Sequence, residues 1–128
     1  MNLSLADFLN SISNPRTRKG YKSGIKAFYN WFGKSPEEIL EMRKANLTPK
    51  PNENPVDFKF RASNFERILE KFHGYIIEQG KTKNTARALC IGVRQLFRYY
   101  QMPIPIRKGS PVRNRSRGSL VITVMFLA

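Results

Sequence analysis

Lysine and arginine side chains are the residues of this chain best suited to a chemical task, and they are concentrated in two segments. Residues 8–36 hold six of them and no acid, and residues 79–128 hold ten and no acid. Residues 37–78 are almost balanced, with eight acids and seven bases. If folding brings the two basic segments to one side, the net charge of +14 forms a single positive face. Such a face is the electrostatic signature of a nucleic-acid binder.

Helical periodicity separates the basic side chains of both segments from the apolar ones. Arg87, Arg94 and Arg98 fall in one narrow arc of a helical wheel, away from the apolar stripe of their segment. Lys19 and Lys26 lie opposite the apolar stripe of the first segment in the same way. The predicted DNA-binding residues are Thr17, Lys19, Lys22, Ser23, Lys26, Lys81, Lys83, Thr85, Arg87, Arg94 and Arg98.

Each residue type in this set suits a different contact with double-stranded DNA. The lysines suit phosphates, and the Thr and Ser hydroxyls add neutral hydrogen bonds. The arginines suit either phosphates or base edges, because a guanidinium pairs with guanine through two hydrogen bonds. Ile91 lies among the arginines, where it is placed to contact a thymine methyl group.

A solvated surface is the ordinary explanation of a charged helix face. Such faces usually mix the two signs and use ion pairs four residues apart, as the Glu66, Arg67, Glu70 and Lys71 series does. The two basic segments contain no acid between Phe8 and Pro36 or after Gln79. Because uncompensated like charge destabilises a compact state, a polyanionic partner is the more economical reading.

The sequence offers little for other kinds of chemistry. One cysteine, Cys90, and one histidine, His73, cannot build a zinc site in this chain, and we expect no cofactor. There is no glycine-rich phosphate loop and no nucleophile elbow. Cys90 has helical spacing to Leu89 and Val93, which is typical of a small core residue. We therefore predict that the chain is not an enzyme.

Start and stop signals predict the helices that carry these residues. Helices are expected after Ser4, Asn14, Ser35, Ser63 and Thr82, which are all good N-cap residues. Gly33 and Gly80 are suited to end two of them. Residues 48–55 hold three prolines and are expected to form a loop. The predicted fold is an all-α orthogonal bundle of four to five helices.

The pattern changes near residue 106. Residues 1–106 are expected to form the helical domain, and residues 107–128 a basic linker followed by an apolar tail that reads as a strand with no sheet to join. We interpret this tail as the remnant of a missing C-terminal domain. No secretory signal or membrane-spanning run is evident, and a lone cysteine suits a reducing compartment. The expected location is the cytoplasm, with no membrane partner.

Two motifs resemble the N-terminal core-binding domain of tyrosine recombinases, the phage-integrase and Xer-like family. The first motif consists of Asn14, Thr17, Tyr21, Ile25, Phe28, Trp31 and Phe32. The second consists of Gly80, Thr82, Thr85, Leu89, Val93, Arg94, Phe97, Arg98 and Tyr99. The resemblance covers about residues 3–106. It implies a SAM-like helical domain that clamps one side of a DNA recombination site and assembles with other recombinase protomers.

The chain departs from that family in its chemistry. The family's catalytic domain supplies two arginines, a lysine, an H-x-x-R histidine motif and a nucleophilic tyrosine. Here His73 is followed by Gly74, Tyr75 and Ile76 instead of the required arginine, and we expect the catalytic half to be missing. The resemblance therefore implies DNA binding in integration or recombination without catalysis. The alternatives are a protein-interaction module that docks on an intact recombinase or an acidic partner through the Ile91 face, and RNA binding.

Overall fold

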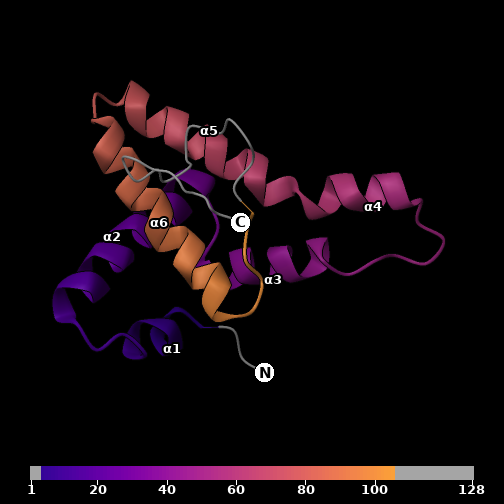
Figure 1. Cartoon of the computed structure of the whole chain (residues 1–128), viewed down its shortest axis with the longest axis horizontal. Helices are drawn as coiled ribbons and strands as arrows, with labels where there is room; N and C mark the ends of the chain where they lie inside the picture. The colour runs from indigo at the N-terminus through magenta and orange to yellow at the C-terminus, as the bar shows by residue number, and fades with distance from the viewer. Residues whose placement is uncertain (1–3, 106–128) are drawn as a thin grey trace, which may run out of the picture.

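The computed structural model describes residues 4–105, which form six α-helices and no strand (Figure 1). The helices are α1 (Leu5–Asn10), α2 (Pro15–Phe32), α3 (Pro36–Asn46), α4 (Pro55–Ala62), α5 (Asn64–Glu78) and α6 (Lys83–Tyr99). The prediction of an all-α bundle is confirmed. The proposed linker and tail, residues 107–128, lie outside the described residues.

Helix α4 has no counterpart among the expected helices, and it brings the number to six. It is eight residues long and buries none of them, so it offers no apolar stripe for periodicity to detect. The sequence does contain the start signal of this helix, an Asn followed by a Pro. In the structure Asn54 accepts a hydrogen bond from the Val56 N–H, and Pro55 occupies the first turn. Arg61 fixes the helix by donating to the Ala45 carbonyl at 2.6 Å and pairing with Glu53 at 2.6 Å.

A helix starts directly after each of the five predicted cap residues, and the side-chain cap hydrogen bond is present at four of them. The side chains of Ser4, Asn14, Ser35 and Thr82 each accept from a backbone N–H of the first turn. The predicted cap at Ser63 is wrong. Since α4 runs directly into α5, the Ser63 hydroxyl instead donates to the Phe60 carbonyl at 2.8 Å.

The apolar stripes of α2, α5 and α6 meet in one core. Phe28 of α2 packs edge-on against Phe72 of α5, with ring centroids 5.2 Å apart. Phe65 of α5 packs against Phe97 of α6 at the same separation. Cys90 is fully buried, as predicted for a small core residue, and burial raises the pKa of its thiol to about 12. The periodicity therefore identified the buried faces correctly.

Helices α2 and α6 cross in direct backbone contact (Figure 1). A Cβ atom added at Gly24 would lie 2.5 Å from the Leu89 carbonyl oxygen, and one added at Gly92 would lie 2.9 Å from the Tyr21 carbonyl oxygen. Real Cβ atoms do not approach backbone so closely, so only glycine fits at either position. This crossing fixes which face of each helix is turned towards the other.

Two polar anchors hold the ends of the described chain against the bundle. The Tyr100 hydroxyl accepts from the Ser4 N–H at 2.8 Å and donates to the Ser4 carbonyl at 2.6 Å. The buried Arg43 guanidinium donates to the carbonyls of Ala62, Met102 and Pro103 at 2.8, 3.3 and 2.7 Å. Arg43 therefore fixes the path of the chain after α6.

No helix within residues 4–105 is both long enough and apolar enough to cross a membrane.

Candidate nucleic-acid interface

The basic residues of α2 form an exposed row, the lysine row, made of Lys19, Lys22 and Lys26. All three side chains are exposed, and none takes part in a hydrogen bond or ion pair within the described part of the chain. Ser23 is exposed on the flank of this row. Gly24, which contacts α6, lies about 200° from Lys26 on the helical wheel. The lysine row therefore faces away from α6.

The basic residues of α6 lie on one side of the helix, as predicted, but their environments differ. Arg87 and Arg94 are half-buried, whereas Arg98 is exposed. Arg87 donates to the Asn84 side chain at 3.2 Å, and its buried Nε has no partner among the described residues. Arg94 lies near Glu66, and burial lowers the pKa of its guanidinium while the charge of Glu66 partly offsets this effect.

The expectation that the two rows form one continuous face is wrong. Gly92 contacts α2, and Arg94 follows it by two residues, about 200° around α6. Since Lys26 likewise points away from the crossing, Lys26 and Arg94 project from opposite sides of the α2–α6 pair. The glycine contact is the physical reason, because it turns the basic face of each helix away from the other helix.

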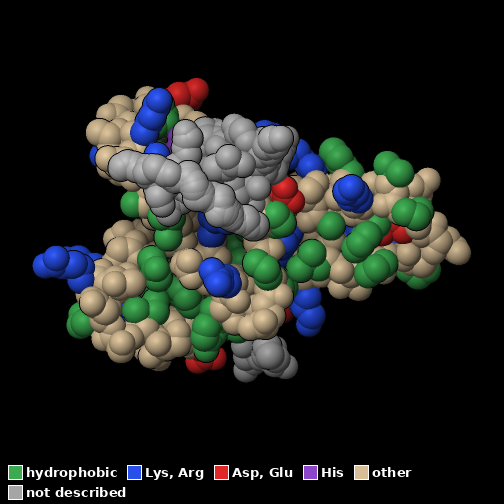
Figure 2. All heavy atoms as spheres, viewed as in Figure 1, with side chains coloured by type: hydrophobic (Ala, Val, Ile, Leu, Met, Phe, Trp, Pro, Cys, Tyr) green, Lys and Arg blue, Asp and Glu red, His purple; other side chains and the backbone are tan. Residues whose placement is uncertain are grey.

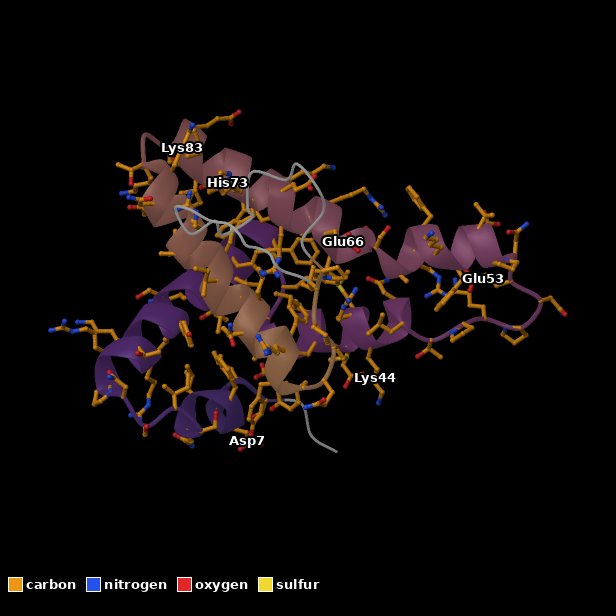
Figure 3. All side chains as sticks on the ribbon, viewed as in Figure 1. Asp7, Lys44, Glu53, Glu66, His73 and Lys83 are labelled. Carbon is orange, nitrogen blue, oxygen red and sulfur yellow. The ribbon has the colours of Figure 1, made fainter. Side chains whose placement is uncertain are left out.

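The first turns of α2 and α6 do lie along the same edge of the molecule, at the left in Figure 1. We call this the N-terminal edge, made of residues 14–22 and 81–87. Of the predicted DNA-binding residues it contains Thr17, Lys19, Lys22, Lys81, Lys83, Thr85 and Arg87. Lys83 is labelled at the start of α6 in Figure 3. Two segments about 60 residues apart in the sequence thus place cations at the same side of the view, those of α2 low and those of α6 high.

The N-terminal edge has an unusual charge for helix starts. The first turns of α1, α3, α4 and α5 each carry at least one acid, as the helix dipole favours. The first turns of α2 and α6 carry none. They hold Arg16 and Lys83 instead, two exposed cations at the positive end of a dipole. Arg16 was absent from the predicted set, and its place in the first turn after Asn14 is the signal that identifies it.

Hydroxyl groups at this edge are only partly free. The Thr82 side chain caps α6 by accepting from the Thr85 N–H at 3.1 Å, and it also donates to the Thr85 hydroxyl at 3.1 Å. Thr85 is exposed, so its hydroxyl can still donate to a ligand. Thr17 is half-buried, and its N–H bonds the Asn14 side chain at 3.1 Å. Both threonines border cations of the edge.

His73 lies on α5 behind this edge and is 6% exposed (Figure 3). Burial lowers its pKa first, and the charges of Arg87 and Lys83 lower it further. The imidazole is therefore held neutral at physiological pH. His73 therefore lies at the edge of the core, where it reports on the charge at the start of α6.

On the face drawn in Figure 2, cations lie at several separate places rather than in one cluster. Within the described residues, no group of three His, Cys, Asp or Glu side chains is placed to hold a metal ion. A comparison of the chain with protein-family models, curated proteins and solved structures gives no match.

Proposed function

We propose that this chain binds double-stranded DNA through phosphate contacts along the N-terminal edge, extended by Lys26 of the lysine row. The observation that carries the proposal is the reversed charge at the first turns of α2 and α6. Cations there oppose the helix dipole, whereas every other described helix carries an acid in its first turn. This arrangement does not stabilise the fold, but it favours the binding of a polyanion.

The chemistry of the edge suits phosphate groups. Backbone N–H groups and the dipole at a helix start attract anions, and the two first turns present them on the same side. Lys19, Lys22 and Lys83 add exposed point charges with no described partner. Lys81 and Lys26 bring the number of free lysines in the proposed site to five. Such contacts supply affinity and fix orientation, while base contacts are needed for sequence choice.

The biological context that we propose is DNA recombination. The two motifs that resemble the core-binding domain of tyrosine recombinases fall on α2 and α6, the same helices that build the edge. In this role the chain would hold one side of a DNA site beside other recombinase protomers. It would not perform strand transfer, since none of the described helices presents the family's catalytic set.

The experiment is fluorescence anisotropy with a labelled DNA duplex of about 20 base pairs over a range of salt concentrations. Five phosphate contacts predict that log K falls with log salt at a slope of roughly −4 to −5. The variant Lys81→Gln/Lys83→Gln should bind more weakly. Its slope of log K against log salt should be about two units shallower, because two phosphate contacts are lost.

Lys59→Gln/Lys71→Gln is the matched control. It removes the same charge from exposed sites on α4 and α5, away from the edge. It should keep the parent slope and nearly the parent affinity. Equal weakening by both double variants, or a salt-independent affinity, would contradict the proposed site. Circular dichroism confirms that each variant retains its helices.

A protein-interaction role is the second candidate, and one feature of the structure favours it. Arg94 and Arg98 are turned away from the lysine row and line a groove of their own. The chemistry of that groove differs from that of the edge.

A further inference from the structure

A groove runs between the C-terminal half of α6 and the chain that follows it. We call it the arginine groove, and it is lined by Arg94, Gln95, Arg98, Gln101, Pro103 and Ile104. Arg94 and Arg98 lie four residues apart and so share one helix face. Arg94 and Arg98 belong to the predicted DNA-binding set, whereas Gln95 and Gln101 do not.

The wall of the groove is fixed before any ligand arrives. Gln101 adopts a left-handed conformation with φ of 62°, and its N–H donates to the Arg98 carbonyl at 3.0 Å. The buried Arg43 guanidinium holds the Met102 and Pro103 carbonyls from below. Ile104 is only 3% exposed and packs into the core. A site with a fixed wall loses less entropy when it binds a partner.

Arg94 is the side chain of the groove that most needs a partner. It is half-buried, yet no hydrogen bond joins its guanidinium to another residue in the described part of the chain. Glu66 of α5 is near enough to raise its pKa but forms no ion pair with it. A half-buried guanidinium without acceptors is costly, and an incoming carboxylate would satisfy it.

The other surfaces of the groove narrow the class of ligand. Two guanidiniums and two amides offer donors for carboxylates, while the exposed Pro103 offers an apolar surface beside them and the buried Ile104 supports it from the core. The phosphates that a duplex presents along its backbone match the donors of the groove but not this apolar surface. A peptide that carries both acidic and aliphatic side chains satisfies both parts of the lining.

We propose that the arginine groove binds an acidic, aliphatic-containing peptide segment of a protein partner, with Arg94 and Arg98 pairing with its carboxylates. This site is separate from the N-terminal edge and does not rest on DNA binding. Because Lys26 and Arg94 project from opposite sides of the α2–α6 pair, the chain can hold a peptide and a duplex together. It would thereby connect a DNA segment to an acidic protein.

The test uses the full chain and a fluorescein-labelled hexapeptide of alternating Glu and Leu, with an alternating Gln and Leu hexapeptide as the uncharged control. We expect saturable binding of the acidic peptide only. Arg94→Gln/Arg98→Gln should weaken it at least tenfold, because both charge-assisted contacts with the peptide are lost. The matched double variant Lys19→Gln/Lys26→Gln removes the same charge from the opposite face and should leave peptide binding unchanged.

Competition with an unlabelled duplex separates the two sites. The proposal expects the bound peptide to remain when the duplex is added in excess of its own dissociation constant. Displacement of the peptide would show that the groove belongs to the DNA site, and equal loss in both double variants would show attraction to net charge alone. Either result, or no saturable binding of the acidic peptide, overturns the inference. None of these results decides whether the duplex binds at the N-terminal edge.

Discussion

The lysine row of α2 and the arginine row of α6 carry the same charge in different surroundings. The three lysines of α2 are exposed and unpaired within the described residues, and they differ from one another only in position. The arginines of α6 differ in their surroundings. Arg87 is half-buried near His73, Arg94 is half-buried near Glu66, and Arg98 is exposed at the groove. A uniform row suits a repetitive polyanion, whereas a graded row suits a ligand with distinct parts.

The contrast originates at the α2–α6 crossing. Gly24 and Gly92 bring the two backbones together, so each helix must present its opposite side to solvent. A single wide positive face would need the two rows on the same flank of the crossing. The structure has two surfaces instead, one on each side of the crossing. Arg43, which fixes the chain after α6, and Gly24, at the crossing, keep these surfaces apart, and the first two predictions concern them.

Arg43→Met should have the largest effect on stability. It removes the donor to three carbonyls, and it leaves those of Met102 and Pro103 without a described partner. We expect the free energy of unfolding to fall by about 3 kcal/mol or more, because each buried unsatisfied group costs about 1–3 kcal/mol. Urea denaturation measures the change. Lys44→Met, at the exposed neighbouring position, is the control and should change stability by less than about 0.5 kcal/mol.

Gly24→Ala should come next. Its Cβ would meet the Leu89 backbone, so the helices must separate, at a cost of about 1–3 kcal/mol. Gly20→Ala is the matched control on the same helix, because nothing lies within 4 Å of its added Cβ. That control should stabilise the protein by roughly 0.5–1 kcal/mol through helix propensity. Thermal unfolding compares the two, and equal effects would mean that the crossing is not tight.

The duplex affinity should separate the two rows. Lys19→Gln/Lys22→Gln/Lys26→Gln removes three proposed phosphate contacts and should lower the steepness of the salt dependence by about three units. Arg94→Gln/Arg98→Gln should leave the slope unchanged, because the groove lies on the other side of the crossing. Anisotropy titrations at several salt concentrations measure both. A larger loss in the arginine variant would reverse the assignment of the two surfaces.

The titration of His73 gives a smaller but specific readout. Burial, Arg87 and Lys83 lower its pKa in the folded state, so the unfolded state binds the proton more readily. Stability should therefore fall as pH drops through about 6.5, and His73→Gln should flatten that slope. Phosphates at the start of α6 would offset the two cations. Duplex binding should therefore raise the pKa of His73 in proton NMR titrations, whereas the acidic peptide should not change it.

Glu53 provides the smallest expected effect and reports on α4 alone. The hydrogen bond from Arg61 lowers the pKa of this carboxyl to about 2, with further help from the Lys50 N–H. Its contribution to stability is present above a pH of about 4.5 and is lost as pH falls towards 2. Glu53→Gln should remove this pH dependence from hydrogen exchange in α4 while leaving exchange in α6 unaffected. A matching change in α6 would mean that the two regions open together.

Much of the fold follows from short-range sequence signals. Ser35 with Glu38, Asn14 with Pro15, and the stripes of α2, α5 and α6 marked helices that the structure contains. Helix α4 escaped prediction because it is held by the polar contacts of Arg61 rather than by an apolar stripe. Ser63 was assigned a cap because its spacing to Glu66 was read without knowledge of the preceding helix.

The candidate site was less predictable than the fold. Helical periodicity predicted which face of α2 and which face of α6 is basic. Lys26 lies on the basic face of α2 and Arg94 on the basic face of α6, as predicted. Their relation depends on which face of each helix meets the other, and that is decided by Gly24 and Gly92 across a long sequence separation. A wheel drawn for one helix contains no such information. The arginine groove was missed for the same reason, since residues 101–104 complete it only after the chain turns back.

The central claim is that the duplex binds at the N-terminal edge, and amide chemical-shift mapping of the full chain with an unlabelled duplex tests it most directly. The account predicts the largest shifts at Arg16, Lys19, Lys83 and Thr85, with little change at Gln95, Arg98 and Gln101. Shifts concentrated around the arginine groove, or spread evenly over every exposed lysine including Lys59, would contradict it.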